Sequence, residues 1–547
     1  MSDCLSHPYG VKPPGNAFLA TNEERMVRQN GLGRFNCIND DELLMELLSF
    51  LSFREVVALN RVSRAFYVYS MHNELWRDIM LRSRKDDFFF YHTWKDTFAS
   101  TYSKENDTTS AKSSISLPCP HKPLRINGIY SHALHRSWIC RNINLQSECR
   151  HFLLDNIERT EASDLSCWEF VNKYERQNIP LIIKGVVNKW PAYEKWSNEY
   201  LSEKCGDFNF RATSATAAGA ANFTMKQYVQ YAENTNEEAP LYLFERDFNS
   251  ISSLRDDYSV PTYYSPDAEH GADLFRLLGD RERPDFKWLV VGPERSGSIF
   301  HIDPNQTNAW NGLIRGRKKW IFYPPGVAPP GVTMSEDGAD VTEPISTGEW
   351  CLAFWKYHEE ARNHPDVHKR PLEAILEAGE LIFVPHNWWH MVINIEYSVA
   401  ITHNYVSSSN LIDCLSFLKN KQDQISGVRD RPMEAIQADE LYEHFVATLS
   451  RNYPDLLSAS LHSVENQEKQ SKIKATDNNI PKPTELLKTI GKKKKISTVY
   501  SNSKQSDLFN SNSCHVNKMN GGHNDNNNSE HCDGDQNSSK KFSFSFF

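Results

Sequence analysis

Apolar residues near the N-terminus recur three and four positions apart, a spacing typical of amphipathic helices. Asn39, followed by Glu42 three residues later, predicts an N-cap with a capping box. We therefore expect residues 36–80 to form a module of three short helices, after a polar and poorly ordered N-terminus at residues 1–35. The repeating side chains are Leu43, Leu44, Leu47, Leu48 and Leu51, then Val56, Val57, Leu59, Val62 and Phe66, with Leu75 and Trp76 at the end.

The middle of the chain changes to short apolar and β-branched runs. Residues 179–183 and 241–244 read as buried strands, and residues 222–233 between them have the pattern of an amphipathic helix. Between residues 288 and 405, glycine and proline separate the runs WLVVG, SIFHI, AWNGLI, KKWIFYPP, GELIFVP, HMVINI and SVAITHNYV. Many short strands at this spacing predict a β-sandwich or a β-barrel.

Shifts in composition divide the chain into segments. Residues 101–120 are rich in serine, threonine and lysine and predict a linker or an exposed loop. The end of the chain is rich in asparagine, serine, lysine and histidine, with too few apolar residues to bury a core. After the N-terminal module we expect a helical linker region at 81–164, a strand-rich domain at 165–408 with its barrel core at about 270–408, C-terminal helices at 409–460 and a disordered tail at 461–547.

Charge and cysteine content narrow the class of protein. The chain has 547 residues and a formal net charge of −9, which argues against a protein that coats nucleic acid, although it leaves local basic patches open. Its eleven cysteines are scattered, without a CxxC pair, and this favours a reducing compartment. No basic segment followed by an apolar run opens the chain, and no apolar stretch is long enough to span a bilayer. We expect a soluble protein without a membrane partner.

A candidate metal site stands out in the strand-rich domain. In a strand, His301 and Asp303 would point to the same face. Two imidazoles and one carboxylate bind Fe(II) through one face of an octahedron, and His390, which follows two tryptophans, is the best candidate for the second imidazole. Zinc also accepts such ligands and stays open at this point. His364 and His368 lie in a charged loop, and we expect them to be solvated.

One class of enzymes with such an Fe(II) site is the oxygenases that use 2-oxoglutarate. An enzyme of this class also needs a cation that binds the distal carboxylate of 2-oxoglutarate. Lys318 and Lys319 begin an expected strand, so one of them points inward and the other outward. A lysine that faces a barrel interior is costly unless an anion pairs with it. We expect Arg317 and one of the two lysines to be solvated. Thr402, in a later strand, would add a hydroxyl group.

At these residues the chain resembles the jumonji-C oxygenases, and within them the phosphatidylserine-receptor branch of lysyl hydroxylases and proposed arginine demethylases. The segments that carry the likeness are VVGPERSGSIFHIDPNQTNAWNGLIRGRKKWIFYPPG and LEAGELIFVPHNWWHMVINIEYSVAITHNYVSSSN. The resemblance implies an α+β fold, with a double-stranded β-helix (jelly-roll, cupin-like) catalytic barrel and flanking helices. It implies Fe(II), 2-oxoglutarate and O₂ as cofactors and co-substrates, with ascorbate as reductant. The implied iron ligands are His301, Asp303 and His390, Lys318 would pair with 2-oxoglutarate, and Tyr242, Ser298, Asn311 and Thr402 would line its pocket.

Residues 37–78 resemble an F-box, which implies docking to the adaptor of an SCF ubiquitin ligase. Three functions follow as alternatives: an oxygenase that hydroxylates or demethylates lysine or arginine in nuclear proteins such as histones or RNA-processing factors, a ligase subunit whose barrel only binds its target, and a structural cupin or zinc module. The complete ligand set favours the oxygenase.

The sequence also gives expectations about where the protein is located and what else it binds. The run Lys492–Lys495 suggests a nuclear protein, with a cytoplasmic pool left open. Helices after Asn410 suggest a homodimer, as in members of the resembled family. Arginine and lysine residues near the barrel leave direct contact with RNA or DNA open, although no RNA-binding motif is present.

Overall fold

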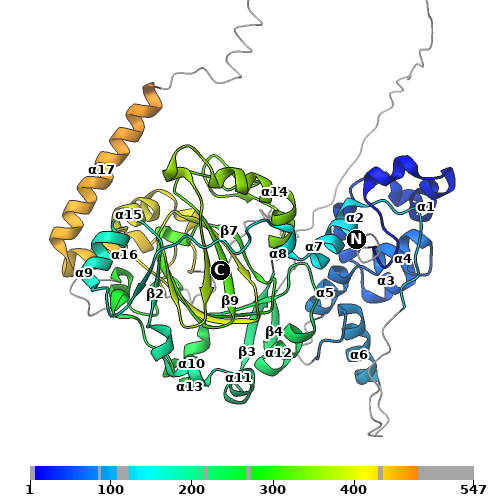
Figure 1. The fold of residues 1–547 in the computed structure, drawn as a ribbon, viewed down its shortest axis with the longest axis horizontal. Helices are drawn as coiled ribbons and strands as arrows, with labels where there is room; N and C mark the ends of the chain where they lie inside the picture. The colour runs from blue at the N-terminus through cyan, green and yellow to red at the C-terminus, as the bar shows by residue number, and fades with distance from the viewer. Residues whose placement is uncertain are drawn as a thin grey trace, which may run out of the picture. The chain divides into compact units, whose positions relative to one another are not determined.

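The computed structural model describes residues 6–83, 88–106, 122–206, 208–214, 220–265, 273–428 and 435–477. Figure 1 shows a block of β-strands with helices around it, and a group of short helices near the N-terminus. The α+β class expected from the sequence is confirmed. None of the helices in these residues combines the length and the apolar character needed to cross a membrane.

Two β-sheets form the centre of the strand-rich domain. The larger sheet has the order β1 (Arg159–Glu161), β2 (Leu181–Lys184), β13 (Leu381–Val384), β8 (Asn308–Arg315), β15 (Ser398–Tyr405), β6 (Lys287–Gly292), β5 (Tyr242–Glu245), β3 (Asn209–Thr213) and β4 (Ala221–Thr224). The smaller sheet has the order β12 (Leu372–Glu377), β9 (Arg317–Tyr323), β14 (Trp389–Asn394) and β7 (Gly297–His301). From β6 to β9 and from β12 to β15, successive strands alternate between the sheets, as in a jelly roll.

Strand β9 shows how the sheets bury both faces. Trp320 and Phe322 belong to an apolar cluster built from strands of both sheets, so this face points into the barrel. Ile321 and Tyr323 belong to a second cluster with α14 (Thr347–Arg362), which covers the outer face of the smaller sheet. The two-residue period of the strand therefore sorts neighbouring side chains into different environments.

The N-terminal region is more ordered than its composition suggested. Residues 22–32 form α1, whose N-cap Thr21 makes a capping box with Glu24. This corrects the expectation of a poorly ordered segment at 1–35. The helix is capped, and it is also packed on the module, because Leu32 is buried and Arg28 donates to Tyr69 and Asp41. The module that follows has four helices instead of three: α2 (Asp41–Ser49), α3 (Phe53–Leu59), α4 (Arg64–Ser70) and α5 (Asn73–Arg82). The N-cap of α2 is Asp40, not Asn39.

The region expected to be a helical linker is packed into the fold. It carries α6 (Trp94–Asn106), α7 (His132–Asn142) and α8 (Leu145–Glu148). Phe90 and Trp94 are buried against Tyr231 of α12 (Met225–Asn234). Most of the segment expected to be a linker at 101–120, namely residues 107–120, lies outside the described residues. The remaining short helices of the domain are α9 (Cys167–Phe170), α10 (Pro191–Lys195), α11 (Asn198–Lys204) and α13 (Ser252–Arg255).

Helices follow the barrel, as expected. They are α15 (Leu411–Asn420), α16 (Leu441–Asn452) and α17 (Pro454–Asp477). Leu411, Leu415 and Phe445 are fully buried in a separate apolar cluster of this region. Helix α17 continues to Asp477, so residues 461–477, which were expected to begin the disordered tail, are helical. Residues 478–547, including the run Lys492–Lys495, lie outside the described part of the chain.

Candidate metal centre and cosubstrate pocket

Three ligand-type side chains meet at one end of the smaller sheet. His301 ends β7 and pairs across the strands with His390 in β14, and their ring centroids are 4.2 Å apart. One ligand atom from each histidine and one from Asp303 lie within 4.8 Å of one another. Asp303 lies just past the end of β7, before a turn that begins at Pro304, instead of continuing the strand as expected. The structure nevertheless brings together the three residues that the sequence proposed as ligands.

The hydrogen bonds of both imidazoles set their tautomers. Nδ1 of His301 lies 2.9 Å from the carbonyl oxygen of Ile299, and Nδ1 of His390 lies 3.0 Å from that of Trp388. A carbonyl oxygen only accepts, so each Nδ1 carries the proton and each Nε2 keeps its lone pair for a metal. Burial lowers the pKa of each ring to about 4, and both are therefore neutral ligands at pH 7.

The carboxylate of Asp303 gives an independent test of whether a cation fits. Burial raises the pKa of Asp303 to about 6, because the charged form has lost its hydration. Its Oδ2 atom is buried without a hydrogen-bond partner among the described residues. A divalent cation would replace the lost hydration. Two nitrogen ligands and one oxygen ligand also suit Fe(II) with open positions, so these residues fit the expected metal.

A cavity of about 60 Å³ between the two sheets joins this centre to the expected cosubstrate residues. The larger sheet contributes Tyr242, Asn311 and Thr402. The smaller sheet contributes Ser298, Lys318 and the two histidines. All the site residues proposed from the sequence therefore line one space.

Lys318 has the surroundings of an anion-binding residue. Its side chain is buried, and its Nζ donates to the hydroxyl of Tyr242 (2.9 Å) and to Oδ1 of Asn394 (2.7 Å). Burial lowers the pKa of Lys318 to about 7. Both partners are neutral, and Lys318 forms no ion pair with a carboxylate in the part of the chain that the structure describes. A carboxylate of 2-oxoglutarate would supply the missing negative charge.

Asn394 is a contact that sequence reasoning missed. It follows His390 and Val392 at two-residue steps along β14, and that alternation was the available signal. Among the predicted residues, Asn311 has a buried Oδ1 without a partner among the described residues. The hydroxyl of Thr402 donates to the carbonyl oxygen of Trp310 at 2.9 Å, which leaves its oxygen lone pairs for a ligand.

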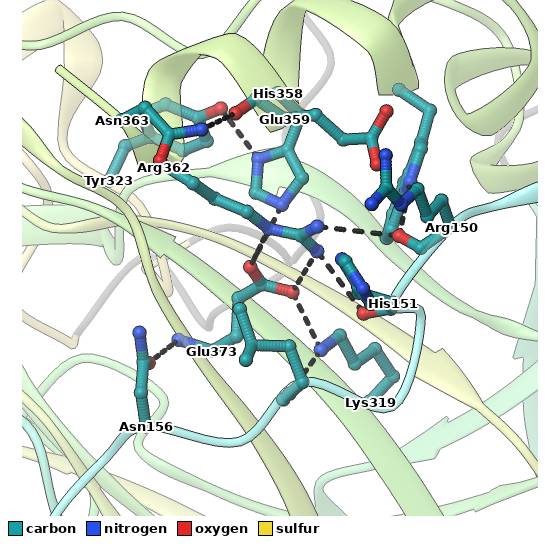
Figure 2. Close-up of polar contacts among 12 residues, drawn as sticks. Arg150, His151, Asn156, Lys319, Tyr323, His358, Glu359, Arg362, Asn363 and Glu373 are labelled. Atoms are coloured by element: carbon teal, nitrogen blue, oxygen red, sulfur yellow. Dashed lines mark hydrogen bonds and ion pairs between the residues drawn. The ribbon is translucent and has the colours of Figure 1, made fainter.

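The expected solvation of the second lysine is wrong. Lys319 is fully buried on the outer face of β9, where its Nζ lies 2.7 Å from Oε2 of Glu373 (Figure 2). Arg362 donates to both oxygens of the same carboxylate, at 2.7 and 3.0 Å. The outer face of the sheet is covered by α14, so outward does not mean solvated. Arg317 was also expected to be solvated. It is about one-third exposed and lies beside Glu377, so it agrees with that expectation better than Lys319 does.

The other loop histidines stay away from the metal centre. His368 is exposed, and His364 is half-buried with its ring against the backbone of Asp366. Neither belongs to the group of ligand atoms around Asp303.

Comparisons with known proteins agree with this geometry. Residues 168–411 match the cupin-like domain family, and residues 41–82 match the F-box-like family. The Arginine-specific demethylase JMJ22 of Arabidopsis thaliana is 38% identical over 452 residues, which are 82% of this chain and 82% of that protein. The chain belongs to the JmjC family of cupin-like oxygenases.

Two further relatives of this JmjC protein differ in how much they share. The Bifunctional arginine demethylase and lysyl-hydroxylase psr-1 of Caenorhabditis elegans is 36% identical over 309 residues, 55% of this chain and 70% of that protein. The 2-oxoglutarate and iron-dependent oxygenase JMJD4 of Danio rerio is 28% identical over 317 residues, 52% of this chain and 67% of that protein. The JmjC protein is thus an enzyme, an oxygenase that depends on iron and 2-oxoglutarate.

Proposed function

We propose that this JmjC enzyme oxidises lysine or arginine side chains of nuclear proteins such as histones or RNA-processing factors, by hydroxylation or by demethylation. The observation that carries the proposal is the single cavity that holds the His301, Asp303 and His390 ligand set together with the buried ammonium of Lys318. The names of JMJ22 and psr-1 support arginine demethylation and lysyl hydroxylation as the reactions to test.

The roles of the chain's own residues follow from their positions. When bound, Fe(II) supplies the oxidising chemistry that joins one oxygen atom of O₂ to the substrate while 2-oxoglutarate becomes succinate and CO₂. Lys318 binds the distal carboxylate of 2-oxoglutarate, and Tyr242 and Asn394 orient the ammonium group. Trp320 and Val392 line the same cavity and keep water from it.

The first test measures succinate formation from 2-oxoglutarate by protein purified without oxygen and supplied with Fe(II) and ascorbate. We expect His301→Ala and Asp303→Ala to abolish turnover, because each removes a metal ligand. His368→Ala is the matched control, since His368 is an exposed histidine of the same domain. Unchanged turnover in the two ligand variants would contradict the assigned centre.

A second measurement separates the two reactions. Methylated and unmethylated arginine and lysine peptides from histones and splicing factors would be incubated with the enzyme and analysed by mass spectrometry. A stable gain of one oxygen on lysine indicates hydroxylation, and loss of a methyl group with release of formaldehyde indicates demethylation. Succinate formation without modification of any peptide in the panel would contradict the proposed substrate class.

One observation also favours a second function, docking to an SCF adaptor. Helix α2 buries Leu44 and Leu48 in the module but leaves Leu43 and Leu47 exposed, beside the exposed Phe50. A contiguous apolar face exposed on a helix favours docking of a partner. We expect Leu43→Asp with Leu47→Asp to abolish co-purification with the SCF adaptor. Val367→Asp, at an exposed position of the catalytic domain, should leave it intact. Equal adaptor recovery with both proteins would argue against docking through this face.

We also propose that the protein is nuclear and that it forms a homodimer. A fluorescent fusion in which Lys492–Lys495 are changed to alanine should lose nuclear enrichment if this run directs import. For the proposed homodimer through the helices after Asn410, light scattering that detects only a 63.0 kDa species would contradict the idea.

A further inference from the structure

A second cavity lies in the N-terminal part of the chain and shares no residue with the metal centre. Its volume is about 290 Å³, several times that of the metal-site cavity. It is lined by the segment 7–9, the junction of α4 and α5, residues 92–96 around the start of α6, Pro123 and one face of α7. Five stretches that are distant in sequence therefore line one cavity.

Two cations face this cavity outside ion-pair distance of any carboxylate in the described residues, although the charge of Glu74 acts on Arg141 and that of Asp96 on Lys95. The guanidinium group of Arg141 lies 4.8 Å from the ring centroid of Trp138, and its Nε is buried without a hydrogen-bond partner. The Nζ of Lys95 contacts Sδ of Met71 at 2.7 Å and lies 5.8 Å from the ring centroid of Trp76. In the described part of the chain, neither cation lies within ion-pair distance of an acidic group.

The two carboxylates in the lining are already engaged. Glu74 lies 3.0 Å from Nε2 of His72 and accepts a hydrogen bond from the hydroxyl of Ser137 at 3.1 Å. Asp96 accepts from the hydroxyl of Thr93 at 2.8 Å and stands in the first turn of α6, where the helix dipole favours a negative charge. The acidic groups are thus satisfied within the wall, whereas the cations keep unused donors that would attract an anion.

The rest of the lining suits an apolar or aromatic body. Val68, Met71, Leu134 and Tyr9 face the cavity, and His7 stands edge-on to Trp138 with ring centroids 5.5 Å apart. A volume near 300 Å³ is at the lower end of the range for small-molecule sites, which combine apolar walls with a few placed polar groups. We propose that this cavity binds a small organic anion, a carboxylate or phosphate ester on an apolar or aromatic body, with its charged group on Arg141 and Lys95.

The test is a calorimetric titration of the full-length, metal-free protein with phenyl phosphate and with benzoate. We expect at least one of these aryl anions to bind, and Arg141→Met and Lys95→Met each to weaken its affinity by about tenfold, the effect of one charge-assisted hydrogen bond. Arg61→Met is the matched control, because Arg61 is an exposed cation of the same module outside the cavity. Arg141→Lys keeps the charge without the planar fork and is expected to lose less affinity than Arg141→Met.

Two further readouts keep the result interpretable. Lys318→Ala should not change the affinity for the aryl anion, and Arg141→Met should retain succinate formation, because the two cavities share no residue. The proposal is overturned if neither anion binds, if Arg141→Met and Arg61→Met bind equally well, or if Lys318→Ala alone removes binding, which would place the anion in the barrel. A Met variant that unfolds is replaced by Arg141→Gln with Lys95→Gln, read in the same way.

Discussion

Lys318 and Lys319 are neighbours in sequence with opposite surroundings. Lys318 faces neutral oxygens in the barrel, and Lys319 faces a carboxylate under α14. Burial lowers the pKa of Lys318 to about 7, so its ammonium form depends on an incoming anion. For Lys319 burial also lowers the pKa, but the charge of Glu373 opposes this. The same residue type therefore binds an anion at position 318 and forms a buried ion pair under α14 at position 319.

The first prediction concerns the pH dependence of 2-oxoglutarate binding. Since the pKa of unliganded Lys318 is about 7 and the carboxylate binds the ammonium form, the site must take up a proton above that pH. We expect KM for 2-oxoglutarate to rise between pH 7 and 9, by up to about tenfold per pH unit. Succinate assays across this range measure it. Lys318→Arg stays charged and should remove the slope, whereas a flat wild-type profile would contradict the prediction.

The second prediction compares two glutamates of β12. Glu373→Gln leaves Lys319 and Arg362 buried without their carboxylate and should lower the free energy of unfolding by about 3–5 kcal/mol. Glu377→Gln removes only a partly exposed contact with Arg317 and should cost less than about 1 kcal/mol. Denaturant unfolding of both variants provides the comparison, and equal losses would show that the buried network adds no more stability than the partly exposed contact of Glu377.

The stability supplied by Glu373 should also depend on pH. Burial by itself raises its pKa, but contacts with His358 and Arg362 and the charge of Lys319 outweigh this and hold the pKa at about 2. A depressed carboxyl pKa adds stability that is present above the unfolded value near 4.5 and is lost as the pH falls toward 2. We expect wild type and Glu373→Gln to converge in stability over that interval, and a constant difference would contradict the assignment.

At the scale of elements, the crossing from β8 to β9 positions the cosubstrate lysine. Gly316 stands alone between the two strands with φ of 81°, where the chain leaves the larger sheet and enters the smaller one. A Cβ atom there would collide with the carbonyl oxygen of Tyr397 and with Ser398. The corner is therefore open only to glycine, and Lys318 follows two residues later.

The third prediction tests this corner. Gly316→Ala should lower the free energy of unfolding by about 1–3 kcal/mol and raise KM for 2-oxoglutarate, because strain at the corner displaces Lys318. Gly326→Ala is a matched control: its φ is 79° and no atom would meet the added Cβ. The difference between the variants isolates the collision from the cost of the left-handed backbone. Equal losses would mean that the crowding at Gly316 relaxes freely.

At the scale of the molecule, buried ion pairs join the N-terminal module to the catalytic domain. Arg77 of α5 is fully buried and its Nη1 lies 2.9 Å from Oε1 of Glu237, which precedes β5. The next residue, Glu238, accepts from Arg136 of α7 at 3.0 Å and from the hydroxyl of Ser346 at 2.6 Å. The module is therefore packed on the oxygenase instead of being tethered to it.

The fourth prediction follows from that joint. Arg77→Met leaves Glu237 buried without its cation and should lower the free energy of unfolding by about 3–5 kcal/mol. Arg82→Met, an exposed position of the same helix, should change it by less than about 0.5 kcal/mol. We expect the Arg77 variant to lose succinate formation at a lower temperature, together with its helical signal. Loss of helical signal with activity unchanged would show that the module unfolds independently.

The sequence by itself determined the features that depend on short spacings. Helical periodicity marked the module, and short apolar runs between glycine and proline marked the strands of the barrel. His301, Asp303 and His390 were predictable because their residue types suit a metal, whereas the choice of Lys318 over Lys319 came only from the resemblance to the jumonji-C oxygenases. Local pattern overlooked the N-caps Thr21 and Asp40, whose side chains accept hydrogen bonds from the first turns of α1 and α2.

Only the tertiary structure decided the contacts between distant segments. Lys319 meets Glu373, Arg77 meets Glu237, and Asn394 reaches Lys318, because the jelly-roll topology brings these strands and helices together. Alternation along β14 could place Asn394 on the inner face of the sheet, but no local rule predicts which distant residue each of these side chains contacts, since that depends on what covers each face. The sequence thus identifies the chemistry of the metal centre, while the packed fold determines which charges are buried and what each of them contacts.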